Sequence, residues 1–252
     1  MRILTSLDEK KKRGIKSFAV LIDPDKIQDL ASFKELIDLC NKTSVDYIFV
    51  GGSLLVKGSL DETVQLVKKS TKIPLVLFPG SNLHIDKSAD GILFLSLISG
   101  RNPELLIGQH VAAAPILRNS HVEVLSTGYI LVGDNMKTTV AHMSQTSPIP
   151  TKKSDIAVCT AMAGELLGMK LIYLDAGSGA EQQVPIEMVE KVKKSIEIPL
   201  IVGGGINSVS KAQRAFEAGA DMIVLGTAVE KHSQFIAEVA ETRNQINAIT
   251  HS

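Results

Sequence analysis

The 252-residue sequence has no tryptophan and only two cysteines, and aromatic residues make up just 4 % of it. The two cysteines, Cys40 and Cys159, lie far apart and show no CxxC spacing, which argues against a disulfide framework. We expect two reduced, buried thiols instead, as is usual for a protein of the cytoplasm, and we predict that location.

The sequence also lacks an excess of either charge, because 27 lysines and arginines balance 27 aspartates and glutamates. A neutral chain has no global field for nucleic acid, so no such partner is expected and any anion site must be local. No apolar run reaches the roughly 18 to 20 residues that span a bilayer, so only a peripheral membrane contact stays open. Residues 1–18 lack a signal-peptide core and predict an amphipathic helix that ends near Gly14. Its basic run Lys10–Arg13 is expected to be solvated, with attraction to lipid headgroups as the alternative.

Short apolar runs bounded by glycine, proline or aspartate alternate with helical patterns along the chain. This alternation is typical of parallel strands that are buried on both faces. The runs are Phe18–Asp23, Tyr47–Gly52, Pro74–Pro79, Gly91–Leu97, Val122–Val132, Leu171–Asp175, Pro199–Gly203 and Met222–Gly226. Eight βα units in 252 residues predict one domain, residues 1–252, folded as an α/β (β/α)₈ TIM barrel. A doubly wound open sheet is the fallback.

The segments between the predicted strands carry helix signals. Ser59–Glu62 forms a capping box, Ser208 is placed to cap the seventh helix, and Gly219 is placed to end that helix in a left-handed conformation. Only 11 residues separate Pro79 from Gly91, whereas a crossover with its helix needs about 10 to 12. We therefore predict that a loop or short turn replaces the third helix and leaves a cleft in the outer wall.

A second irregular segment, residues 133–153, follows the fifth strand and is rich in threonine, serine and proline. Its position places it at the C-terminal mouth, where the active sites of barrels lie. A surface loop and a lid over the substrate are both compatible with this composition.

Three glycine-rich turns follow the last three strands: Ala176–Ala180, Gly203–Asn207 and Gly226–Ala228. Glycine permits positive φ and lets backbone N–H groups approach an anion closely. In (β/α)₈ enzymes the turns after strands seven and eight commonly bind phosphate together with a helix N-terminus. Three such turns at one corner of the mouth predict a phosphate site.

Tyr173 and Asp175 alternate along the sixth strand, so their side chains lie on the same face. If this face is the barrel interior, Asp175 meets the hydroxyl end of the phosphate ligand and can serve as a general base. Capping of the following turn is the alternative role for Asp175.

Acidic and hydroxyl groups end the first two strands. Asp23 is followed by Pro24, which fixes the turn and directs the carboxylate into the mouth, and Ser53 places a hydroxyl on the neighbouring loop. Mg²⁺ is usually held by one or two carboxylates, substrate phosphate oxygens and water, which predicts Mg²⁺ at Asp23 and Ser53. Asp25 is the weaker candidate, because it can cap the following helix. We expect this metal corner to lie across the mouth from the phosphate corner.

These motifs resemble those of the geranylgeranylglyceryl phosphate synthase family, which is related to bacterial heptaprenylglyceryl phosphate synthases. The motifs that carry the resemblance are Leu21–Asp25, Val50–Ser53, Leu77–Gly80, Gly128–Tyr129, Tyr173–Gly179, Val202–Ile206 and Val224–Thr227. Two positions depart from the family pattern. Leu21 stands where some relatives carry lysine, and Asp175 stands where many carry glutamate.

The resemblance implies a Mg²⁺-dependent prenyltransferase that joins a polyprenyl diphosphate, geranylgeranyl diphosphate above all, to the C3 hydroxyl of sn-glycerol 1-phosphate. The diphosphate leaves, an allylic cation-like carbon forms, and Asp175 takes the proton of the attacking hydroxyl. It also implies Mg²⁺ on Asp23 and Ser53. The residues implied to bind glycerol phosphate are Tyr173, Leu174, Asp175, Ala176, Gly177, Ser178, Gly179, Gly203, Gly204, Gly226 and Thr227.

For Tyr129 and Arg101 the sequence allows either a contact with substrate or a purely structural position. Tyr129 points either into the substrate groove, as the resemblance favours, or into the core. Arg101, after the fourth strand, either contacts the diphosphate or is solvated. The six histidines show no metal-ligand spacing. Barrels of this kind associate through their outer helices, so a homodimer or hexamer is expected.

Two other functions stay open on the sequence alone. A phosphosugar isomerase or a barrel like thiamine-phosphate synthase shares the phosphate corner but needs no apolar channel of about 20 Å. A non-catalytic phosphate-binding assembly subunit would need neither Asp23 nor Asp175.

Overall fold

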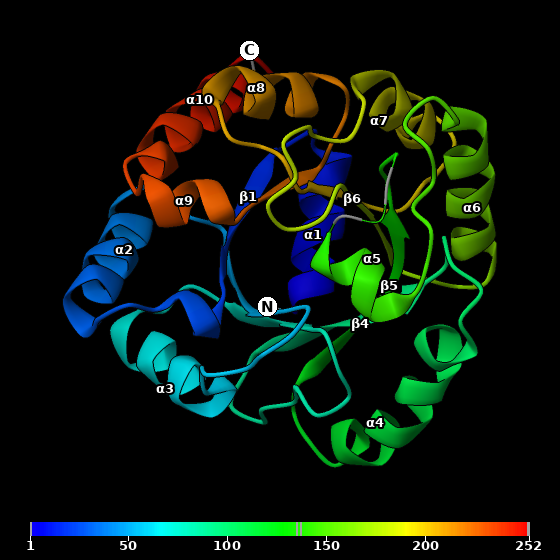
Figure 1. Cartoon of the computed structure of the whole chain (residues 1–252). Helices are drawn as coiled ribbons and strands as arrows, with labels where there is room; N and C mark the ends of the chain where they lie inside the picture. Colours follow the sequence, from blue (N-terminus) through cyan, green and yellow to red (C-terminus); the bar gives the residue numbers. More distant parts are fainter. Residues whose placement is uncertain (1, 135, 137, 251–252) are drawn as a thin grey trace.

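The computed structural model describes residues 2–134, 136 and 138–250, and its eight parallel strands close into a barrel in sequence order (Figure 1). The strands are β1 (Ser17–Ile22), β2 (Tyr47–Gly52), β3 (Leu75–Pro79), β4 (Gly91–Leu97), β5 (Glu123–Leu131), β6 (Leu171–Asp175), β7 (Leu200–Gly203) and β8 (Met222–Leu225). Closure comes from the pairing of β1 with β8, in which Ser17 lies opposite Met222. The predicted barrel is confirmed.

Helices form an outer ring around the strands (Figure 1). The ring contains α2 (Leu30–Lys42), α3 (Leu60–Ser70), α4 (Gln109–Arg118), α6 (Ser154–Leu166), α7 (Ile186–Lys193), α8 (Val209–Glu217) and α10 (Phe235–Thr250). Shorter turns near the mouth are η1 (Pro24–Lys26), η2 (Glu104–Gly108), α5 (Thr139–Ser144) and α9 (Thr227–Lys231). None of the described helices is long and apolar enough to cross a membrane.

Most strand residues are apolar because each side of the sheet packs against a separate core. Along β1, Phe18 and Val20 pack outward against the helices, whereas Ala19 packs into the barrel interior. The N-terminal helix α1 (Ile3–Lys12) covers the base of the barrel, where Ile3 and Leu7 join the interior core. Helix α1 ends at Lys12, two residues before Gly14, as predicted.

The expected capping residues adopt their predicted roles. The hydroxyl of Ser59 accepts from the N–H of Glu62, and that of Ser208 accepts from the N–H of Lys211. Gly219 has a φ of 105°, the left-handed conformation expected after α8.

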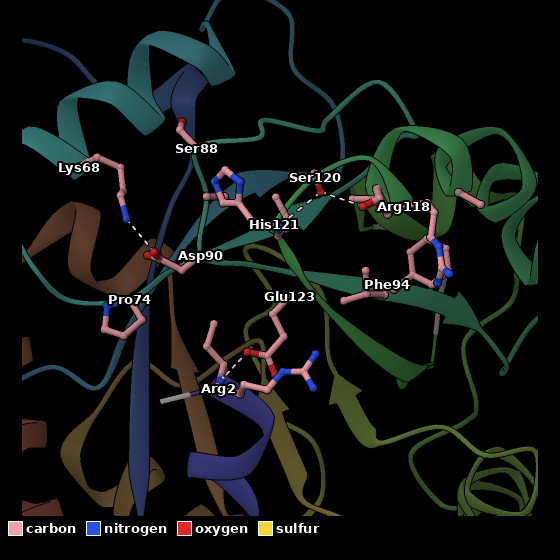
Figure 2. A pocket seen from close by; sticks show the side chains of 16 residues that line it. Arg2, Lys68, Pro74, Ser88, Asp90, Phe94, Arg118, Ser120, His121 and Glu123 are labelled. Carbon is pink, nitrogen blue, oxygen red and sulfur yellow. Dashed lines mark hydrogen bonds and ion pairs between the residues drawn. The ribbon is translucent and has the colours of Figure 1, made fainter.

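No helix forms in the connection between β3 and β4, residues 80–90, all of which the structure describes. The loop is held by carboxylates instead, since Asp86 accepts from the N–H of Ser88 and Asp90 accepts from the N–H of Leu75. A cavity of about 1280 Å³ opens between α3 and α4 where the helix is missing, as Figure 2 shows. The predicted cleft in the outer wall is therefore present.

Three details differ from the sequence-based expectations. Cys40 is buried, which raises the pKa of its thiol to about 12, but Cys159 is exposed on the outer face of α6. Lys10 is not simply solvated, because its ammonium group binds Asp46 at 2.5 Å at the base of the barrel. Lys11 approaches Glu197 at 3.8 Å, so the basic run lies at the end opposite the mouth.

The segment 133–153 is more ordered than its composition suggests. It contains α5, and Ile149 pairs with Val132 at the end of β5. Ala141, Ser144 and Ile149 are buried, so a purely solvated surface loop is wrong for this stretch. Residues 135 and 137 lie outside the described part of the chain.

Candidate active site

The barrel interior holds a polar pair near the mouth, formed by Tyr129 on β5 and Asp175 on β6. The Tyr129 hydroxyl donates to Oδ2 of Asp175 at 2.5 Å, and the Gly177 N–H donates to Oδ1 at 2.8 Å. Tyr173 shares the interior face with Asp175, as strand alternation predicted. The capping role considered for Asp175 is present, because Oδ1 accepts from the N–H of the following turn, while Oδ2 accepts from Tyr129.

Burial raises the pKa of Asp175, and the hydrogen bonds from Tyr129 and Gly177 act in the opposite direction without cancelling it. Burial and the charge of Asp175 raise the pKa of Tyr129 well above its usual value, so its hydroxyl stays a donor. A carboxylate with a raised pKa is a better proton acceptor than an ordinary aspartate.

Three aromatic rings line the interior beside this pair. The Phe78 ring, from the end of β3, stacks on Tyr173 at a centroid distance of 5.5 Å and meets Tyr129 edge-on at 6.2 Å. Phe78 lies within the motif Leu77–Gly80, but no role was predicted for it. Its position at the end of a buried strand could have indicated that it faces the site.

Two of the three glycine turns, those after β6 and β7, lie against each other at the mouth. A methyl group on Gly204 would come within 2.6 Å of Oδ1 of Asp175 and 2.7 Å of the Gly177 nitrogen. A methyl group on Gly203 would lie 2.3 Å from the Tyr173 hydroxyl. The turns after β6 and β7 thus form a single corner, the glycine corner, that has no room for side chains.

The remaining residues predicted to bind glycerol phosphate differ in whether their backbone or their side chain is available to a ligand. Leu174 and Ala176 pack in the core outside the barrel, so only their backbone faces the glycine corner. Ser178 is exposed at the tip of the turn, and Gly226 precedes Thr227, the first residue of α9. The first N–H groups of a helix have no partner within it, so α9 adds free donors beside β8.

The segment before α5 reaches over the glycine corner. A methyl group on Gly177 would lie 2.7 Å from the side chain of Thr138. Thr138 also begins α5, because its hydroxyl accepts from the N–H of Ala141. This contact places part of the 133–153 segment where a lid would lie.

Asp23 and Ser53 follow the ends of the paired strands β1 and β2. A methyl group on Gly52 would lie 3.4 Å from the Asp23 carboxylate, so Asp23 leans towards the end of β2, next to the residue before Ser53. Oδ1 of Asp23 accepts from the N–H of Asp25 at 3.1 Å, and Oδ2 lies 3.7 Å from Nζ of Lys26.

This donor set fits Mg²⁺ bound together with a substrate. The described residues hold no group of three or more histidine, cysteine or acidic side chains that could hold a metal without help. Magnesium is usually held by one or two carboxylates while substrate phosphates and water supply the other ligands. Asp23 with the Ser53 hydroxyl provides such a partial site.

Asp25 does not cap a helix, and that expectation is wrong. Its carboxylate accepts from the N–H groups of Val56, Lys57 and Gly58 at 2.8, 2.9 and 2.5 Å, which lowers its pKa. Helix α2 is capped by Asp29 instead. Asp25 therefore fixes the loop that follows Ser53.

Strand β8 separates the metal corner on β1 and β2 from the glycine corner on β6 and β7. Strand β1 pairs with β8, and a methyl group on Gly226 would lie 3.7 Å from Leu21. Lys26 lies between the two corners, 3.0 Å from Glu230 of α9. Lys26 was not predicted as a site residue, because nothing in the sequence indicates that its partner Glu230 lies next to it.

Arg101 is turned towards its own loop. Its guanidinium donates to the carbonyl oxygen of Gly100 at 2.6 Å and to that of Ile98 at 3.3 Å. A contact between Arg101 and a diphosphate would require these bonds to be exchanged.

The PcrB family model matches residues 8–243 of the sequence. The chain belongs to the PcrB family. Among curated relatives of this PcrB protein, the geranylgeranylglyceryl phosphate synthase of Chitinophaga pinensis is 52 % identical over 240 residues, 95 % of each chain. That of Thermococcus gammatolerans is 43 % identical over 226 residues, 89 % of this chain and 88 % of its own.

Solved structures give the same result for this PcrB chain. The (S)-3-O-geranylgeranylglyceryl phosphate synthase of Thermoplasma acidophilum, in complex with its substrate sn-glycerol-1-phosphate, superposes with a TM-score of 0.89. It is 32 % identical, and the match covers 97 % of this chain and 99 % of that one. The thiamine phosphate pyrophosphorylase of Pyrococcus furiosus, at 14 % identity and a TM-score of 0.57 over 96 % of this chain and all of that one, shares only the fold.

Proposed function

We propose that this PcrB protein is a geranylgeranylglyceryl phosphate synthase, a prenyltransferase that forms an ether bond between sn-glycerol 1-phosphate and geranylgeranyl diphosphate. One observation carries the proposal: a buried carboxylate with a raised pKa, Asp175, adjoins a side-chain-free glycine corner. The full-length likeness to synthases with this name, one of them with glycerol phosphate bound, supports it.

In this proposal the glycine corner binds the phosphate of sn-glycerol 1-phosphate through backbone N–H groups. The glycerol then extends towards the barrel axis, where Asp175 takes the proton from the C3 hydroxyl as its oxygen bonds to C1 of the prenyl chain. The bond from C1 to the diphosphate breaks with its electron pair on the diphosphate. Tyr129 holds the Asp175 carboxylate in place.

Asp23 and Ser53 are the residues that would hold Mg²⁺. When bound, the ion supplies positive charge that stabilises the departing diphosphate. Lys26, between Asp23 and Glu230, adds a positive side chain at the same place and compensates for Leu21, where some relatives have lysine.

The prenyl chain needs an apolar path away from these charges. A small hollow lined by Ile85, Ile92 and Phe94 lies beneath the β3–β4 loop, and Phe94 also lines the larger cavity in the gap between α3 and α4. The far wall of that cavity is charged, with Lys68 and Glu123 among its residues. We call the hollow and the adjoining end of the cavity the trench, and we assign the trench to the prenyl chain. The phosphosugar isomerase alternative has no use for it.

Self-association through the outer helices belongs to the same proposal. Val111 and Ile116 on α4 and Ile156 and Met162 on α6 are exposed apolar residues on neighbouring helices. Such a face is typical of homodimer interfaces. The cytoplasmic location stays a prediction from cysteine usage.

Purified protein incubated with labelled sn-glycerol 1-phosphate, Mg²⁺ and prenyl diphosphates of several lengths tests the function. We expect an organic-soluble ether product and release of diphosphate. Absence of product at every chain length would contradict the proposal. Turnover of a sugar phosphate without any prenyl donor would favour an isomerase instead.

A further inference from the structure

Large apolar side chains are exposed around much of the barrel mouth. Those that follow strands β1 to β5 include Leu30, Leu54, Val56, Leu83, Ile107 and Met143, which we call the apolar rim. Within the described chain, the turns after β6, β7 and β8 expose no large apolar side chain. The mouth is therefore divided into an apolar arc and a polar arc that contains the glycine corner.

The loops of the apolar rim are fixed by hydrogen bonds to their backbone. Asp25 binds the N–H groups of Val56 and its two successors, and the N–H of Leu83 donates to the Ser81 hydroxyl at 3.2 Å. Val56 is nevertheless 71 % exposed and Leu83 84 % exposed. Loops held in this way cannot simply collapse inward to bury these side chains, so their exposure calls for an external apolar partner.

The apolar rim also borders the proposed prenyl site. Leu54 directly follows Ser53 of the metal corner, and the backbone of Gly80, three residues before Leu83, packs against Ser53. A partner on the rim would thus adjoin both the diphosphate site and the upper end of the trench.

We propose that the apolar rim docks the barrel mouth on the surface of a lipid bilayer, so that prenyl chains pass between membrane and trench without crossing water. This inference rests on the proposed function, since only a lipid substrate and product need such a path. A second copy of the chain seated on the rim would cover the entrance to the site. The polar arc would stay in water and admit glycerol phosphate.

The rim residues are apolar and the chain as a whole carries no net charge, so we expect apolar burial to supply most of the attraction. We expect the protein to co-sediment with phosphatidylcholine vesicles. Addition of phosphatidylglycerol or of salt should change the partition coefficient only slightly. Binding that requires phosphatidylglycerol and vanishes in salt would overturn the inference.

Paired substitutions test the assignment of the rim. Val56→Ser with Leu83→Ser should lower the partition coefficient at least about tenfold, whereas Val56→Trp with Leu83→Trp should raise it. The matched control is Leu166→Ser with Leu167→Ser at the end of α6, where the side chains are 86 % and 77 % exposed. This control should bind vesicles like the parent. Equal binding by the serine rim variant and the parent would contradict the proposal.

Light scattering of the same variants tests whether a second copy of the chain, rather than a bilayer, covers the apolar rim. A rim variant that dissociates into smaller species and binds vesicles unchanged would show that a second copy covers the rim. Ether synthesis from soluble farnesyl diphosphate, measured without vesicles, should be retained in the rim variants. In the parent protein, product without vesicle binding would reject the membrane inference alone, whereas vesicle binding without product would reject the proposed function alone.

Discussion

Asp175 is a carboxyl group that the fold keeps from water although this raises its pKa. Two donors, the Tyr129 hydroxyl and the Gly177 N–H, stabilise its ionised form. Such an arrangement costs stability and is typical of residues retained for chemistry.

Asp175→Asn removes the proton acceptor while it keeps the shape of the side chain. We expect kcat to fall by about 10²- to 10⁴-fold, with the KM for sn-glycerol 1-phosphate changed only a few-fold. Steady-state kinetics at saturating prenyl diphosphate measure both values. Unchanged turnover would contradict the assignment of Asp175 as the base.

The Tyr129 hydrogen bond lowers the pKa of Asp175, so its removal should raise that pKa further. A base must be ionised, hence activity falls as the pH drops through this pKa. Tyr129→Phe should therefore move the acid limb of the kcat/KM profile to higher pH, with less loss at the optimum than Asp175→Asn. A pH–rate profile that matches the parent would indicate that Tyr129 only packs.

Asp23→Asn tests the metal corner, with Asp29→Asn as the matched control. Asparagine can still accept the bond that Asp23 takes from Asp25, and it can still cap α2 in place of Asp29. We expect at least about a hundredfold loss of turnover for Asp23→Asn alone, with both melting temperatures near that of the parent. Mg²⁺ titrations of turnover and thermal unfolding measure the two effects. Strong destabilisation by Asp23→Asn would indicate a structural aspartate.

At the scale of elements, the turn after β7 depends on a glycine that has no room for a side chain. Gly204 has a φ of 75° and faces Asp175 and Gly177, whereas Gly168, with a φ of 89°, has open space where a methyl group would lie. Alanine at either position pays a left-handed strain of about 1–2 kcal/mol. Only Gly204→Ala should also raise the KM for glycerol phosphate, at least about tenfold, as kinetics of both variants will show. Equal KM values in the two variants would contradict the glycine corner as the phosphate site.

The strands and the missing helix could be predicted because their evidence is local. Apolar runs, flanking glycines and the short spacing from Pro79 to Gly91 are all read directly from the sequence. The burial of α5 could not be predicted, since the serine- and threonine-rich segment 133–153 has no apolar periodicity and is ordered by its pairing with β5.

The residues of the metal and glycine corners were named from the sequence, but what lies between the two corners was not. Strand order around the closed barrel makes β8 and β1 neighbours, which the linear sequence does not show. The role of Asp25 was missed for a similar reason, because its partners at residues 56–58 are about thirty positions away.

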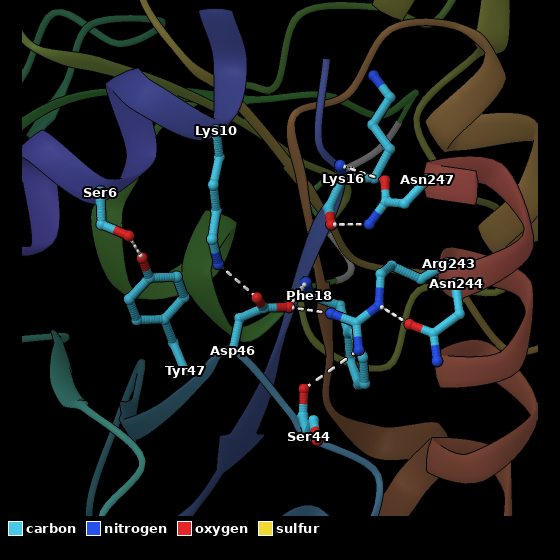
Figure 3. A network of polar contacts seen from close by, with 10 residues as sticks. All are labelled: Ser6, Lys10, Lys16, Phe18, Ser44, Asp46, Tyr47, Arg243, Asn244 and Asn247. Carbon is cyan, nitrogen blue, oxygen red and sulfur yellow. Dashed lines mark hydrogen bonds and ion pairs between the residues drawn. The ribbon is translucent and has the colours of Figure 1, made fainter. Parts of the chain in front are cut away.

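At the scale of the whole molecule, one polar network at the base joins the two ends of the chain (Figure 3). Asp46 receives Lys10 of α1 at 2.5 Å, Arg243 of α10 at 2.6 Å and the N–H of Phe18 on β1 at 3.0 Å. Arg243 also lies over the Phe18 ring, 5.1 Å from its centroid. Asn247 of α10 exchanges two further hydrogen bonds with the backbone of residue 16. The network fixes both terminal helices to the first strand of the barrel.

Removal of Arg243 should therefore weaken closure of the barrel without touching the mouth. Arg243→Ala leaves Asp46 with Lys10 as its remaining cation, so we expect the loss of one hydrogen bond to a charged group, about 1.5–3 kcal/mol. For a domain of this size that is a fall in melting temperature of about 3–12 °C. Lys191→Ala, which removes the exposed partner of Glu187, should change it by less than about 2 °C. Calorimetry measures both shifts in melting temperature.

The network lies at the opposite end of the barrel from Asp175. We therefore expect kcat at 25 °C to stay within about twofold of the parent in each variant. A large loss of kcat in a still-folded Arg243→Ala protein would mean that the base of the barrel and the active site are coupled, contrary to this structure.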